Sequence, residues 1–206
     1  MTYDEYMECA NKHLDAVKGI LGKYESNEND LNSNLPLMLD IYYLCGYILE
    51  GVVVYSAYRS NGWISHEDIK TKYNVVFTIR TNLDFFYNRK VIIRRNGGEI
   101  DITPLCFQNR PSGALSVQGH NFQEISKNLL RNNPTFNGVP YIGNNRNIDP
   151  DIEQLIDHWN PAVRYMHLGS QGLPNLNIDV IKRLFDTCST IYILITRIYN
   201  FTTRII

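Results

Sequence analysis

Residues 35–58, LPLMLDIYYLCGYILEGVVVYSAY, constrain the fold of this chain more than any other stretch. Asp40 and Glu50 are the only charged residues in it, and apolar or aromatic side chains occur all round the helical wheel. This pattern is typical of a helix that is buried on several sides, so we predict the central helix of a helical domain. A membrane span is not predicted, because the longest charge-free piece, residues 41–49, is far shorter than the roughly 20 residues that a bilayer requires.

The composition is that of a globular protein with a core of its own. The chain has 206 residues, of which 44% are hydrophobic and 12% aromatic, so we expect a single domain over residues 1–206. Lys and Arg number 20 against 21 Asp and Glu, so the overall charge indicates neither a nucleic-acid nor a membrane partner. The charged N-terminal residues contain no apolar signal core, which predicts a cytoplasmic protein.

The four cysteines, at positions 9, 45, 106 and 188, are too scattered to form a metal-ligand or disulfide pattern. No Walker-type phosphate loop occurs in the sequence either. We therefore predict no metal and no cofactor.

Four further segments are predicted as helices, from apolar spacing or from capping residues. They span residues 3–24, 120–131, 150–159 and about 177–201. Asp149 is the expected cap of the third of them, and Asn177 or Asp179 that of the last. Residues 25–34 and 132–150 are rich in Asn and are predicted as loops, the second of them flexible. The predicted fold is mainly α, a bundle of four to five helices.

Residues 73–105 differ from the rest because they contain runs of β-branched side chains. The segments RKVIIR and EIDIT flank an Asn-Gly-Gly turn at positions 96–98, and this pattern indicates a hairpin. A small β-containing insertion is therefore predicted at residues 67–117 within the helical domain.

A basic cluster surrounds this hairpin. It consists of Arg89, Lys90, Arg94 and Arg95, and the aromatic residues at 85–87 precede it. Cations beside aromatic rings can bind a nucleic-acid backbone and stack its bases. Charges on an edge strand also prevent aggregation, and the balanced charge of the whole chain favours this second interpretation.

Three motifs, taken in their order along the chain, resemble the HEPN family, the higher-eukaryote and prokaryote nucleotide-binding domain. They are YYLCGYILEGVVVYSAY in the central helix, GHNFQEISKNLL at residues 119–130 and WNPAVRY at residues 159–165. The resemblance implies a bundle of four to five helices that forms a symmetric homodimer. It also implies a bacterial toxin-antitoxin, defence or stress system, with RNA, a nucleotide or a nucleotidyltransferase antitoxin as the partner.

The resemblance also implies where a nuclease motif should lie. Active HEPN ribonucleases carry an Arg, a polar residue and a His after four to six intervening residues, with the Arg stabilising phosphate charge and the His transferring a proton. In this chain the spacing occurs at Arg59 and His66, at the end of the central helix and in the loop after it. The family's motif starts a later helix, so we expect that the nuclease motif is not intact.

Glu50 is the most informative candidate for a binding site. A carboxylate buried in an apolar helix without a partner is costly, so it should face a cation, a hydrogen-bond donor or a water-filled site. We predict a pocket between the central helix and the WNPAVRY segment. Its polar lining would be Glu50, His120 and Arg164, its walls Tyr47 and Trp159, with Tyr165 beside the Arg; the same ion pair would alternatively only stabilise the core.

Three functions are compatible with these observations. The first is a HEPN-like module that binds a nucleotide, RNA or a protein partner without cleaving RNA. The second is an active, metal-independent endoribonuclease that uses Arg59 and His66, or His120 paired with Arg164 by the fold. The third is a non-catalytic structural dimer whose insertion is the interaction element.

Overall fold

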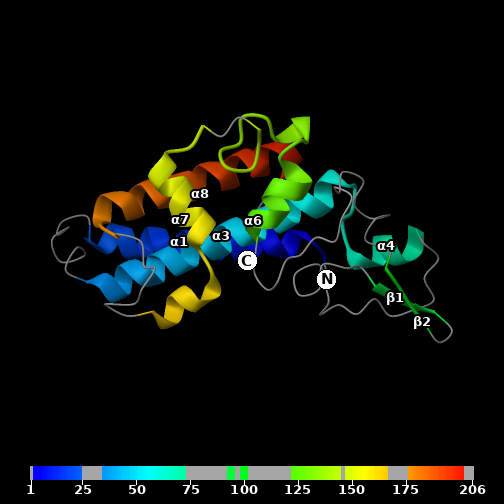
Figure 1. Ribbon diagram of the computed structural model, residues 1–206, viewed down its shortest axis with the longest axis horizontal. Helices are drawn as coiled ribbons and strands as arrows, with labels where there is room; N and C mark the ends of the chain where they lie inside the picture. Colours follow the sequence, from blue (N-terminus) through cyan, green and yellow to red (C-terminus); the bar gives the residue numbers. More distant parts are fainter. Residues whose placement is uncertain are drawn as a thin grey trace.

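The chain folds into a mainly helical bundle around one central helix (Figure 1). Three long helices form its body: α1 (Asp4–Tyr24), α3 (Leu35–Ser60) and α8 (Ile178–Tyr199). The predicted mainly α fold is thereby confirmed. The computed structural model describes residues 2–24, 34–72, 92–95, 98–101, 122–144, 147–166 and 176–201.

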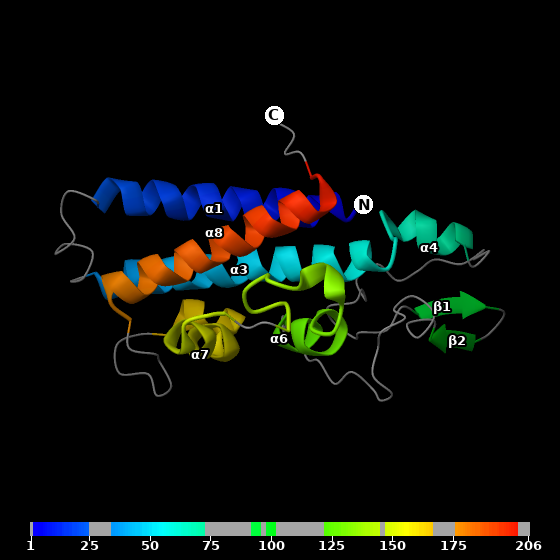
Figure 2. The same cartoon turned by 90° about the horizontal axis from the view of Figure 1, so that it is seen from above.

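Shorter helices cover the side of α3 that faces away from α1 (Figure 2). They are α6 (Phe122–Ile125), which continues into the π-helical turn η3 (Ser126–Leu130), and α7 (Pro150–His158). A 3-10 turn, η5 (Pro161–Tyr165), follows α7 and contacts α3.

Side-chain caps fix the starts of the helices where the sequence predicted them. Asn34 accepts a hydrogen bond from the backbone N–H of Leu37 at 3.2 Å, and Asn177 accepts one from Val180 at 3.0 Å. Asp149 accepts from the N–H of Asp151 at 2.9 Å. Each cap satisfies a backbone donor that the first helical turn leaves without a partner.

α3 is buried on all sides over much of its length. Every residue from position 48 to position 58 is buried, so no face of that part is exposed to solvent. By length and composition α3 is also apolar enough to cross a membrane, but 72% of its most apolar window is buried inside the protein. Beyond its N-terminal residues 35–40, some of which are exposed, two groups of partly exposed side chains remain on α3, and we call them windows: Tyr43, Leu44 and Tyr47 form the first, and Arg59 and Ser60 the second.

Two glycines of α3 allow its neighbours to approach closely. A Cβ on Gly51 would lie 2.7 Å from the carbonyl oxygen of Tyr6 and 3.2 Å from the Cβ of Ala10, so α1 packs directly on the α3 backbone there. A Cβ on Gly46 would lie 1.8 Å from the indole of Trp159. Neither position can hold a larger side chain unless the neighbouring element moves.

The segment after η3 is packed, although the sequence predicted a flexible loop at residues 132–150. Phe136, Val139, Tyr141 and Ile142 are all at most 2% exposed, and the Ser126 hydroxyl donates to the carbonyl of Tyr141. Residues 132–144 therefore form a loop, as predicted, but its Asn and Gly residues bend the chain so that the apolar side chains between them reach the core; the expected flexibility stays a prediction.

The far end of the molecule contains α4 (His66–Lys72) and a two-stranded hairpin (Figures 1 and 2). Strands β1 (Ile92–Arg95) and β2 (Gly98–Asp101) pair antiparallel on either side of the predicted turn. The other residues of the predicted insertion at 67–117, apart from the part of α4 within it, lie outside the described residues, so the insertion as a whole stays a prediction.

We expect Gly51→Ala to destabilise the protein by about 1–3 kcal/mol, because the new methyl group overpacks the contact with α1. The free energy of unfolding, measured by urea denaturation, tests this expectation. Gly19→Ala is the matched control, since nothing lies within 4 Å of that Cβ position. It should stabilise α1 by up to about 1 kcal/mol through helix propensity. Equal stability of Gly51→Ala and the wild type would contradict the close approach of α1 and α3.

Candidate functional site

Three polar or aromatic residues of α3 share one face at its first window. Tyr43, Tyr47 and Glu50 follow at helical steps of four and three residues, which places them side by side. The Tyr43 hydroxyl donates to the Tyr47 hydroxyl at 3.3 Å, and the two ring centroids are 4.8 Å apart. Both rings are half-buried, whereas Glu50 is only 8% exposed. The acid is therefore the buried member of this face, and the two tyrosines are its partly exposed members.

α1 contributes two further polar side chains to this face. Cys9 and His13 are one helical turn apart, and the Cys9 Sγ lies 3.5 Å from the His13 Nε2. The His13 ring centroid is 5.8 Å from that of Tyr47. The carboxylate of Glu50 acts electrostatically on both Cys9 and His13. Glu50 therefore lies close to α1, whose residues the sequence did not suggest as its neighbours.

Trp159 closes the site from the other side of α3. Its ring meets that of Tyr47 edge-on, with 5.3 Å between centroids, and only 3% of the residue is exposed. The Gln123 amide donates to the carbonyls of Ile156 and Trp159, at 2.9 Å each, and fixes this segment against α6. The predicted walls Tyr47 and Trp159 are thus in contact.

We call this group the aromatic-acid site. It consists of Cys9, His13, Tyr43, Tyr47, Glu50 and Trp159. Three of its rings, those of His13, Tyr43 and Tyr47, are partly exposed to solvent. The site can therefore stack against a planar ligand and exchange hydrogen bonds with its edge.

Cys9 and His13 are biased toward their neutral forms. Burial lowers the pKa of His13, and the nearby Glu50 carboxylate only partly offsets this effect. Burial also raises the pKa of Cys9, an effect that Glu50 reinforces and Lys12 opposes. A neutral thiol beside a neutral imidazole is not the activated thiolate of a cysteine nucleophile. The geometry therefore favours binding over covalent catalysis.

The remaining residues of the predicted pocket are placed differently. Tyr165 does not line the site, because its side chain is 80% exposed; in the tight turn η5 it is Val163 that packs into the core. Arg164 belongs to the same turn, but its side chain lies outside the described part of the chain, as does all of His120. The predicted Glu50–Arg164 ion pair and the lining role of His120 stay predictions.

Arg59, the candidate catalytic arginine, lies in the last turn of α3 at the second window. The carbon of its guanidinium is 5.9 Å from the ring centroids of both Tyr55 and Tyr199. His66 is the first residue of α4, and its side chain is not among the described ones. The pairing of Arg59 with His66 therefore stays a prediction.

The basic cluster is described only in part, since Arg89 and Lys90 lie outside the described residues. In the hairpin, Arg94 is opposite Glu99 and Arg95 is opposite Gly98. The register is all that the structure describes of this cluster, so both the nucleic-acid interpretation and the edge-charge interpretation stay predictions.

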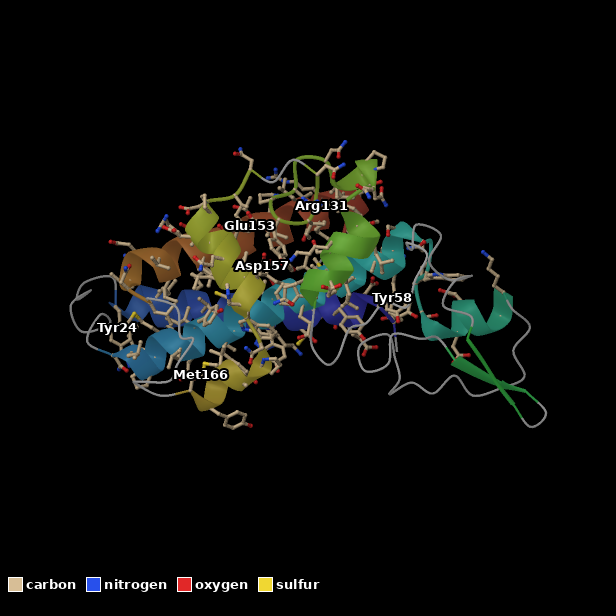
Figure 3. All side chains as sticks on the ribbon, in the orientation of Figure 1. Tyr24, Tyr58, Arg131, Glu153, Asp157 and Met166 are labelled. Carbon is tan, nitrogen blue, oxygen red and sulfur yellow. The ribbon has the colours of Figure 1, made fainter. Side chains whose placement is uncertain are left out.

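Charged and polar contacts at α7 stabilise the bundle near the site. Asp157, labelled in Figure 3, accepts a hydrogen bond from the Tyr141 hydroxyl at 2.8 Å and lies 3.5 Å from the Lys127 ammonium. These contacts of Asp157 connect α7 to η3 and to the packed loop, which is a structural role.

Over the described ranges of the chain, no three His, Cys, Asp or Glu side chains are grouped so that they could hold a metal ion.

Comparisons with protein-family models, with curated proteins and with solved structures give no significant match.

We expect the pKa of His13 to lie below its ordinary value of 6.5 and to fall further in Glu50→Gln, because that change removes the charge that favours the imidazolium. NMR titration of the histidine resonances, with His13→Gln for assignment, measures both values. The unfolded chain binds a proton at His13 more readily than the folded protein does, so the free energy of unfolding should fall as the pH falls through 6.5. In His13→Gln this fall in stability should be smaller. A pKa that rises in Glu50→Gln would contradict the placement of the acid.

Proposed function

We propose that this chain is a HEPN-like binding module without an intact nuclease motif, and that it binds a nucleobase of RNA or of a nucleotide at the aromatic-acid site. Its setting would be a bacterial toxin-antitoxin, defence or stress system. The observation that carries the proposal is the group of three partly exposed rings, His13, Tyr43 and Tyr47, beside the buried carboxylate of Glu50.

The chemistry of these groups suits a base better than a phosphate. Every base has a π-face, and each base stacked on an aromatic side chain contributes about 1–3 kcal/mol. Hydroxyl and imidazole groups can donate to or accept from the edge of a base, and a carboxylate accepts from an exocyclic amino group. A negative charge beside the rings disfavours an anionic group at the same place.

Two observations support binding without cleavage. The Cys9–His13 pair is biased toward neutral forms, so it offers no activated nucleophile. Arg59 lies in the last turn of α3, beside the rings of Tyr55 and Tyr199, whereas the family's nuclease motif starts a later helix.

We also propose a symmetric homodimer, with a nucleotidyltransferase antitoxin as a further partner. Support for the dimer comes from α8, where Ile193 is 44% exposed and Leu194 and Ile198 are only partly buried. An exposed isoleucine beside two apolar side chains that are only partly buried favours association with another surface. Sedimentation equilibrium tests the dimer, which Ile193→Asp should weaken.

We expect Tyr47→Ala to weaken RNA binding about tenfold or more, because a stacked base loses its aromatic partner. Fluorescence anisotropy with short labelled homopolymers of each base, in EDTA, measures the affinity. Tyr24→Ala is the matched control, since Tyr24 is a partly exposed tyrosine at the other end of α1 (Figure 3), and it should bind RNA as the wild type does. Tyr47→Phe separates the ring from its hydroxyl.

Two results would contradict the proposal. Equal affinities of Tyr47→Ala, Tyr24→Ala and the wild type would remove the site from RNA binding. Cleavage of the labelled RNA in EDTA that His66→Ala abolishes would establish the ribonuclease instead.

A further inference from the structure

The second window of α3 is a cluster of a different character. Arg59 and Ser60 are half-buried at the end of α3, and Tyr199 is half-buried in the last turn of α8. The rings of Tyr55 and Tyr199 meet edge-on with 5.5 Å between centroids, and Phe201 lies 5.8 Å from Tyr55. The guanidinium of Arg59 therefore lies beside two phenol rings, at a place that the solvent reaches in part.

Two hydrogen-bond donors of this cluster have no acceptor. Within the described part of the chain, the Nε of Arg59 and the hydroxyl of Tyr199 are both buried, and neither of them donates a hydrogen bond to an acceptor. Roughly 90% or more of buried polar groups in proteins are paired, so two such donors in one cluster require an explanation. A ligand with oxygen atoms that bound between these two donors would supply the missing acceptor.

The charge of the cluster also lacks a counter-ion. Among the described residues, no carboxylate forms an ion pair with Arg59. Asp4 of α1 acts electrostatically on Tyr55, one of the two tyrosines of the cluster. A partly buried guanidinium without a carboxylate attracts a small anion.

A purely structural role does not account for the hydroxyl of Tyr199. Cation–π stacking needs only the ring, and phenylalanine would supply it without burying a polar group. Burial raises the pKa of Tyr199, and the neighbouring Tyr55 adds to this effect, while Arg59 and Ser60 oppose it. The hydroxyl therefore keeps its proton and is available as a donor to an anion.

We propose that Arg59 and the Tyr199 hydroxyl, at the junction of the C-terminal turns of α3 and α8, bind a small oxyanion with the chemistry of a phosphate group. Ser60 supplies a further hydroxyl at the edge of this anion site. The proposal is independent of the aromatic-acid site, because Arg59 lies about two and a half helical turns from Glu50 and thus on the opposite face of α3. Free phosphate and the phosphate of a mononucleotide are the two sources of the anion.

Isothermal titration calorimetry at constant ionic strength tests the proposal, with inorganic phosphate and adenosine monophosphate as the two probes. We expect saturable binding of phosphate to the full chain, weakened about tenfold or more in Arg59→Gln and in Tyr199→Phe. Tyr199→Phe keeps the ring and removes only a hydroxyl, so it should remain folded even if Arg59→Gln does not. Arg197→Gln removes an exposed cation of the same helix and should bind phosphate as the wild type does.

The calorimetry distinguishes the two sources of the anion. Tighter binding of the mononucleotide than of phosphate, lost in Tyr199→Phe, would identify a nucleotide as the ligand, and equal binding would identify an isolated oxyanion. Absence of saturable binding would overturn the proposal. Phosphate binding that is unchanged in Tyr199→Phe, or weakened equally in Arg197→Gln, would overturn it as well.

Discussion

The burial of α3 on all sides is the constraint on which the rest of the structure depends. An apolar helix without a polar face must be enclosed, and α1, α8 and the shorter helices provide that enclosure. Gly51 and Gly46 bring α1 and Trp159 against its backbone, so the positions of those elements follow from the sequence of α3 itself. Contact at such short range leaves little freedom in how the helices cross.

Enclosure of α3 also decides where chemistry can occur along it. Side chains reach the solvent near Tyr43 and Tyr47 and again at Arg59 and Ser60, and the segment between these windows is fully buried. The first window combines rings with an acid, whereas the second combines rings with a cation. The proposed ligands differ accordingly, a base at the first and an oxyanion at the second.

Local signals made the helices and half of the site predictable from the sequence. Apolar periodicity and capping residues such as Asp149 are properties of neighbouring residues, so they located the helices correctly. An acid in an apolar stretch pointed to Glu50. Tyr47 and Trp159, predicted as walls of one pocket, are in contact, and the pocket itself stays a prediction. His13 and Cys9 were missed because their approach to Glu50 depends on how α1 crosses α3, which no local pattern records.

The packing of the loop at residues 132–144 was missed for the same reason, because no local pattern records it. Its Asn and Gly residues mark turns correctly, but they do not show that the turns return Phe136 and Tyr141 to the core. A short helix such as α4 was missed because its seven residues are too few to show helical periodicity.

Native-state hydrogen exchange of the α3 backbone tests the enclosure most directly. If α3 is enclosed as described, the amides of residues 48–58 exchange only when the whole protein unfolds, and their exchange free energy equals the global free energy of unfolding. Exchange of these amides through local opening, at a free energy well below the global value and similar to that of α4, would contradict the account.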